Sequence, residues 1–274
     1  MIYQIQYYSN YANSRLRFTL TKMKKTILNL LIITSILLVS CEKEETKVPV
    51  SNSKTTNLTI NFNNTVDGVP INTISSQYTN EAKNKYSVSL LKYYVTNVVL
   101  VSENNDEFFA KNYNLIDMDR PEQNTFTLLN VPYAKYTKMK FILGVDSLRN
   151  TSGVQDGFLD PSFGMLWTWN TGYIFFKHEG NYIDSLNQTK PLRFHLGTSP
   201  GRGFVAFSLP SVEINSSITK KLTVNFDLNK AYSANKIINF NIDNDRQSES
   251  AADVFWIANL KANLEQSFSF GKVE

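Results

Sequence analysis

The sequence predicts an all-β protein, an antiparallel β-sandwich with long loops and one candidate helix near the C-terminus. Many short segments alternate apolar and polar residues with the period of two that a half-buried strand requires, and Asn, Gly and Pro separate these segments. The sequence lacks the alternation of strands with helices that would indicate a parallel sheet. Of the 274 residues, 42% are hydrophobic and 13% aromatic, which is enough for a large core and argues against a disordered chain.

The expected elements follow from this alternation in chain order. Strands are predicted over 58–63, 86–101, 139–145, 192–196, 205–209, 222–228 and 238–242. The pattern is clearest at 222–228, where four apolar residues alternate with Thr, Asn and Asp. A helix is predicted from about residue 248 to 264, with one face formed by Ala251, Val254, Phe255, Ala258 and Ala262.

The N-terminal 41 residues resemble the leader of an exported lipoprotein. Lys24 and Lys25 precede a mostly apolar run at 27–39, which is shorter than the ~20 residues of a transmembrane helix and typical of a signal peptide. Ser40 and Cys41 then resemble a bacterial lipobox, in which the Cys is lipidated and becomes the first mature residue. The alternative is a free buried Cys after a short apolar helix.

This pattern divides the chain into four parts. Residues 1–22 are predicted to be an extension produced by a start assigned too early, and residues 23–41 to be the signal peptide that ends in the lipidated Cys41. Residues 42–56 are polar and predict a flexible tether, and 57–274 predict a single β-domain. More than one acyl chain at Cys41 would attach this domain stably to a membrane.

Composition and motifs exclude several function classes. Residues 1–41 hold five of the 28 basic residues and no acid, so residues 42–274 carry 23 basic and 24 acidic residues, without a nucleic-acid footprint. One Cys and two His exclude a disulfide framework and a Cys-rich metal site. No nucleophile elbow, HExxH motif or phosphate-binding loop is present, so the chain is not expected to be an enzyme.

The most unusual segment is the turn-rich stretch 156–180. Trp167 and Trp169 lie two residues apart beside Met165, which predicts either a ligand-lining wall or a loop whose indoles plug the core. His178 precedes Glu179 and could bind a metal or titrate, or could end a strand facing solvent.

His195 is the second histidine of the chain. It alternates with the apolar residues of its strand and therefore points away from them. Such a His is usually a surface residue, and it gains interest only if the Trp segment covers that face.

Several motifs together resemble the MbnP-like copper-binding domain family, from about residue 57 to 274. These are LLKYYVTNVVL at 90–100, NLID at 114–117, LNVPYAKY at 129–136, FILGVDS at 141–147, the segment 157–180 and HLG at 195–197. In place of the usual H-I-G-G continuation, Leu196, Gly197 and Thr198 follow the His. Many members of this family are Bacteroidetes lipoproteins, in agreement with Cys41.

The resemblance implies a periplasmic or surface copper binder. In the family a Trp is oxidised to kynurenine, often by a di-haem peroxidase-like partner, and joins His side chains at the copper. Carried over to this sequence, the modified residue is Trp167 or Trp169, the direct His ligand is His195, and His178 is a second candidate ligand. Soft Cu(I) favours imidazole and thioether ligands, which adds Met165 as a further candidate.

Two functions of different classes remain open from the sequence. The first is an outer-membrane lipoprotein, facing the periplasm or the cell surface, that binds copper for acquisition or buffering. The second is a surface β-sandwich module that binds a glycan or an outer-membrane partner without metal, and it requires exposed indoles.

Overall fold

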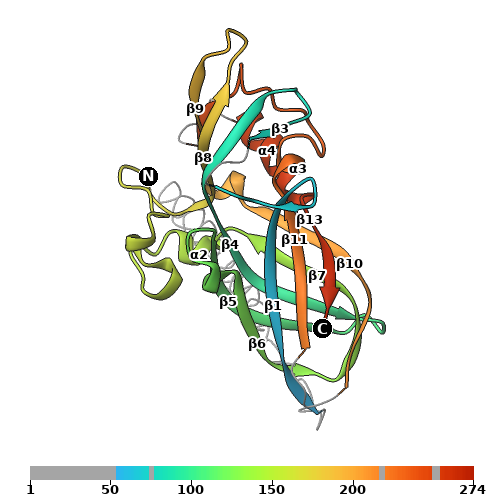
Figure 1. The fold of residues 1–274 in the computed structure, drawn as a ribbon. Helices are drawn as coiled ribbons and strands as arrows, with labels where there is room; N and C mark the ends of the chain where they lie inside the picture. Colours follow the sequence, from blue (N-terminus) through green and yellow to red (C-terminus); the bar gives the residue numbers. More distant parts are fainter. Residues whose placement is uncertain (1–53, 74–76, 216–219, 249–253) are drawn as a thin grey trace, which may run out of the picture. The chain divides into compact units, whose positions relative to one another are not determined.

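The computed structural model describes residues 54–73, 77–215, 220–248 and 254–274, which form two β-sheets with few short helices (Figure 1). This confirms the all-β sandwich. The predicted extension, the signal peptide with Cys41, and the tether up to residue 53 lie outside the described residues. No helix among the described residues is long and apolar enough to cross a membrane.

The smaller sheet has five strands in the order β13-β11-β1-β2, with β6 also paired to β1. Its strands are β1 (Thr55–Val66), β2 (Val69–Pro70), β6 (Thr125–Pro132), β11 (Lys220–Asp227) and β13 (Phe268–Val273). The first strand begins two residues before the predicted domain start at residue 57. β1 and β11 pair in parallel. This sheet is therefore mixed, whereas the sequence predicts antiparallel pairing, and the larger sheet also contains one parallel pair. Period-two alternation does not reveal strand direction, because it reports only which face a side chain occupies.

The larger sheet has eight strands in the order β10-β7-β4-β8-β9-β12, with β3 and β5 also paired to β4. Its strands are β3 (Tyr78–Thr79), β4 (Lys85–Ser102), β5 (Glu107–Asp117), β7 (Ala134–Leu143), β8 (Ile174–Ile183), β9 (Thr189–Gly197), β10 (Gly203–Ile214) and β12 (Asp245–Gln247). The long β4 pairs with β8 through its first half and with β7 through its second half, so one strand connects two regions of the sheet.

Short helices fill the connections. They are η1 (Pro121–Asn124), α2 (Ser147–Asn150), η2 (Gly157–Leu159), η3 (Pro161–Phe163), η4 (Ser199–Gly201), α3 (Leu228–Ala231) and α4 (Val254–Glu265). α4 confirms the predicted C-terminal helix, but the predicted buried face was wrong, since Val254 and Phe255 are 53% and 84% exposed. Its buried side chains are instead Trp256, Ile257, Leu260, Asn263 and Leu264. The buried positions recur every three or four residues and so form one helical face, offset from the predicted one.

The predicted strand at 238–242 does not form. Ile238 and Phe240 are buried, but the backbone there bonds to side chains and to the carbonyls of nearby turns instead of to a neighbouring strand. Asn84 Oδ1 accepts from the Phe240 amide at 2.8 Å, and Asn80 donates to the Ile238 carbonyl at 3.3 Å. Buried asparagines therefore satisfy groups that would otherwise require a sheet ladder.

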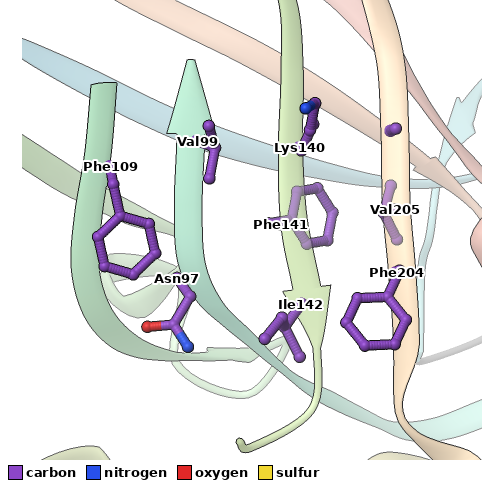
Figure 2. A pocket seen from close by; sticks show the side chains of 9 residues that line it. Asn97, Val99, Phe109, Lys140, Phe141, Ile142, Phe204 and Val205 are labelled. Atoms are coloured by element: carbon purple, nitrogen blue, oxygen red, sulfur yellow. The ribbon is translucent and has the colours of Figure 1, made fainter. Parts of the chain in front are cut away.

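The main core lies between the two sheets and includes Phe62, Tyr93, Phe226 and Phe268. The outer face of the larger sheet is divided into two regions. Near β5 and β10 it is a shallow groove of about 290 Å³, where Phe109 and Phe204 stand on either side of Val99 and Ile142 (Figure 2). Farther along β4 and β8, a loop covers the same face and builds a second apolar cluster, which positions the candidate site.

Candidate functional site

The loop between residues 156 and 173 packs on the outer face of the larger sheet. Tyr94, Leu115 and Phe175 of β4, β5 and β8 form a second apolar cluster with Met165 and Trp167 of the loop, among others. Trp167 is 4% exposed and Trp169 is 62% exposed. The hypothesis that indoles plug a core therefore holds for Trp167 and not for Trp169.

A tight hairpin fixes Trp167. The Ile174 amide donates to the Met165 carbonyl at 2.7 Å, and the Trp167 amide donates to the Gly172 carbonyl at 3.1 Å. Gly172 has a φ of +97°, and a Cβ there would lie 2.7 Å from Asn150 Oδ1, so glycine is required for this turn. Asn150 Oδ1 in turn accepts from the Tyr173 amide at 2.8 Å.

The hairpin places Trp167 over His195 on β9. The two ring centroids are 6.2 Å apart, and the Trp167 and Trp169 rings are 5.4 Å apart. His195 is buried as a result. The condition that gives this His a functional interest, coverage of its face by the Trp segment, is met.

Glu179 orients the His195 ring. Glu179 Oε1 lies 2.7 Å from His195 Nε2, and an ionised carboxylate can only accept, so Nε2 carries the proton in this pair. Burial lowers the pKa of His195, which Glu179 opposes and Lys177 reinforces, so the imidazole is neutral near pH 7. The lone pair is then on Nδ1.

Two buried polar atoms of the site have no hydrogen-bond partner within the described part of the chain. They are His195 Nδ1 and Trp167 Nε1. Gln247 lies near enough to raise the pKa of His195, but it makes no hydrogen bond of ordinary geometry to Nδ1. Buried polar groups are normally satisfied, so these two atoms, like His178 Nε2 on the other face of the sheet, are available to bind a water molecule or a ligand.

His178 lies on the other face of the same sheet. It pairs in register with Phe194, whereas His195 pairs with Lys177, so the two imidazoles point in opposite directions. His178 is fully buried in the main core, which excludes the solvent-facing strand end as well. The structure therefore does not bring His178 and His195 together.

The surroundings of His178 are aromatic. Its Nδ1 lies 2.5 Å from the Tyr232 hydroxyl, and the Tyr86 ring packs edge-on at 6.3 Å. Burial lowers the pKa of His178 to about 3. His178 has the same strand parity as the apolar Phe176 and Tyr182, and this signal in the sequence would have placed it in the core.

The other predicted residues and those that were missed can now be placed. Met165 is fully buried in the second apolar cluster, and the ring beside His195 is that of Trp167. Glu179 forms a hydrogen bond with His195 and not with its sequence neighbour His178. Lys177 and Gln247 were missed, because only the strand register brings them next to His195.

The donor set fits copper in part. Among the described residues, no group of three or more His, Cys, Asp or Glu could hold a metal ion. His195 Nδ1 supplies one borderline nitrogen ligand of the kind that copper favours. A copper ion here would therefore need a further ligand from Trp167 chemistry or from water.

Gly197 offers a test of how closely Trp167 is packed. A Cβ at this position would lie 2.6 Å from the Tyr173 carbonyl oxygen and 2.7 Å from Trp167 Nε1. We expect Gly197→Ala to displace the indole and to lower the free energy of unfolding by about 1–3 kcal/mol, measured by urea denaturation. Gly203→Ala, whose Cβ would meet only side-chain atoms at 3.3 Å or more, is the milder control. Unchanged stability and Trp emission in Gly197→Ala would contradict this packing.

Comparison with known proteins gives one family and one fold. The family model for MbnP matches residues 55–251. The solved structure of MbnP from Methylosinus trichosporium matches with a TM-score of 0.52 at 14% identity, over 80% of this chain and 99% of that one. Proteins of curated function gave no match. Because the family model covers well over half of the sequence, the chain belongs to the MbnP family.

Proposed function

We propose that the protein is an extracytoplasmic copper-binding protein, anchored in the outer membrane through Cys41, that acquires or buffers copper and is not an enzyme. The observation that carries this proposal is the buried pairing of Trp167 with His195, in which Nε1 and Nδ1 have no partner among the described residues. The MbnP family supports a copper-related role. The anchor and the outer-membrane location rest on the sequence at 23–41.

In this proposal His195 binds copper through Nδ1. Glu179 holds Nε2–H, as carboxylates commonly do for a metal-ligating His, and so fixes both the tautomer and the ring orientation. The neutral imidazole has no proton to lose before it binds a cation. Glu179 is an orienting residue here and His195 is the ligand.

Trp167 is the residue that we propose for oxidation to kynurenine. Its ring lies beside His195, whereas the Trp169 ring packs against the Trp167 ring at a tilt of 59° and is exposed. An unmodified indole nitrogen is a poor ligand because its lone pair is delocalised into the ring. Kynurenine adds an aryl amine and a ketone, and a di-haem peroxidase-like partner would supply the oxidation.

A Cu(I) titration against a competing chelator tests this function. We expect a dissociation constant below about 1 μM for protein isolated from its native host, together with bound copper and an intact mass that shows a Trp-to-kynurenine conversion. Absence of copper binding, with or without an oxidised Trp, would refute the proposal.

The exposed Trp169 keeps the alternative open, a surface module that binds a glycan or an outer-membrane partner. That hypothesis requires exposed indoles, and one of the two loop indoles is 62% exposed while the other is buried. It predicts ligand binding that is lost in Trp169→Ala and is indifferent to copper. A glycan array and a pull-down with outer-membrane proteins that found no ligand would count against it.

A further inference from the structure

A continuous chain of polar contacts connects the Trp-bearing loop to His195. Lys177 Nζ donates to the Gly164 carbonyl at 3.2 Å and lies 3.7 Å from Glu179 Oε1. The same Oε1 atom accepts from His195 Nε2 at 2.7 Å. The chain therefore runs from Gly164 through Lys177 and Glu179 to His195, and we call it the polar chain.

The strand register explains why these groups meet. Lys177 on β8 is the cross-strand partner of His195 on β9 and of Lys92 on β4, so the three side chains lie at one level of the outer face. Lys92 pairs in turn with Asp117 on β5, and their charged groups are 2.9 Å apart. Cross-strand neighbours of this kind lie about 5 Å apart at Cβ, within reach of one another.

Both lysines face the same turn of the loop. Lys177 donates to the carbonyl of Gly164, and Lys92 Nζ makes a long contact of 3.5 Å to the carbonyl of Phe163. These two residues end the short helix η3, directly before Met165 and Trp167. The turn is therefore held at its carbonyl oxygens just where the loop begins to cover His195.

The two lysines differ in what their loss would leave behind. Asp117 is buried, with its side chain 1% exposed, so removal of Lys92 would leave an unpaired buried carboxylate and threaten the fold. The Glu179 side chain is 35% exposed, so water can replace Lys177 there. Lys177 can therefore be changed with less risk to the fold.

We propose that Lys177 is a positioning residue for the copper site: it fixes the Trp-bearing loop over His195 and couples loop position to the Glu179–His195 pair. The inference rests on the proposed function. Lys177 itself provides no copper ligand, because its ammonium is engaged with a carbonyl and a carboxylate. Loss of such outer contacts commonly costs about 10- to 100-fold in metal affinity.

The experiment compares Lys177→Met and Lys177→Arg with Lys138→Met in the intact chain. Lys138 is an exposed residue on β7 and serves as the control for loss of a lysine. In a Trp169→Phe background the emitting residues are Trp167 and Trp256, and Trp256 is buried in the main core and unchanged in every variant. A difference in acrylamide quenching between the variants therefore reports whether Trp167 stays covered. Cu(I) affinity is measured by chelator competition and stability by thermal unfolding.

Lys177→Met should increase quenching and weaken Cu(I) binding about tenfold or more, with little change in the unfolding temperature. Lys177→Arg, which keeps the charge and the donor, should restore both readouts, and Lys138→Met should leave both unchanged. A merely structural role would change stability without this pattern.

Three results would overturn the proposal: unchanged quenching and affinity in Lys177→Met, tighter copper binding in that variant, or an equal effect of Lys138→Met. Tighter binding would mean that the Lys177 charge acts mainly by repelling the cation. If the parent chain binds no copper, the proposed function fails by itself, and the quenching comparison still decides whether Lys177 fixes the loop.

Discussion

Replacing His195 with Ala should weaken Cu(I) binding by more than about 100-fold, beyond the usual cost of losing an outer contact. Its Nδ1 is buried, carries a lone pair and has no partner within the described residues, and the centroid of the Trp167 ring lies 6.2 Å from that of the His195 ring. No cluster of three or more His, Cys, Asp or Glu elsewhere in those residues offers the metal a substitute. Chelator competition with a Cu(I) probe measures the loss.

His178→Gln is the matched control for this experiment, because it removes the other His of the chain. His178 points into the main core on the opposite face of the sheet, where Tyr232 occupies its Nδ1. We expect its Cu(I) affinity to stay within about threefold of the parent, less than 1 kcal/mol. Equal losses in the two variants would contradict the separation of the two imidazoles.

Acid should destabilise the protein through His178, and this is the second large effect. The pKa of His178 is about 3 in the folded state against an ordinary value of 6.5, because burial disfavours the charged ring. Between pH 6.5 and pH 3, His178 is therefore protonated in the unfolded chain and neutral in the folded chain. The contribution of the neutral His178 to the free energy of unfolding is complete above pH 6.5. It falls by about 1.4 kcal/mol for each pH unit between 6.5 and 3.

Urea denaturation at pH 7 and pH 4.5 measures this dependence. We expect about 3 kcal/mol of the acid loss in the parent chain to be absent in His178→Gln, which cannot be protonated. The difference between the two proteins reports the protonation of His178, including the part of its low pKa that comes from the nearby His195. Identical losses in the two proteins would show that His178 does not stay neutral in the folded state.

The fold was predictable because alternation reports burial directly. Phe62 on β1 and Phe226 on β11 face the core as the sequence predicts. The strand at 238–242 was wrong, because Asn80 and Asn84 satisfy the backbone that a sheet ladder would otherwise pair. The predicted face of α4 was wrong because apolar residues occur on two sides of this helix, and helical spacing alone does not show that Trp256 and Leu260 face the core while Phe255 is exposed.

The sequence drew attention to two side chains that lie next to each other in the structure, but it could not predict the geometry around them. The sequence singled out Trp167 and His195, and it made the interest of His195 conditional on cover by the loop, which the structure provides. The register between β8 and β9 places His178 and His195 on opposite faces of the sheet. It also brings Glu179 within hydrogen-bonding distance of His195. Register depends on pairing between strands, and period-two alternation within one strand does not reveal it.

The central claim is that copper binds between His195 Nδ1 and Trp167, and diffraction at the copper absorption edge tests it most directly. A crystal of the copper-loaded protein should give an anomalous peak within bonding distance of His195 Nδ1, next to the side chain of residue 167 and on the outer face of the larger sheet. A peak beside His178, a peak elsewhere on the molecule, or no peak in fully loaded crystals would contradict the account.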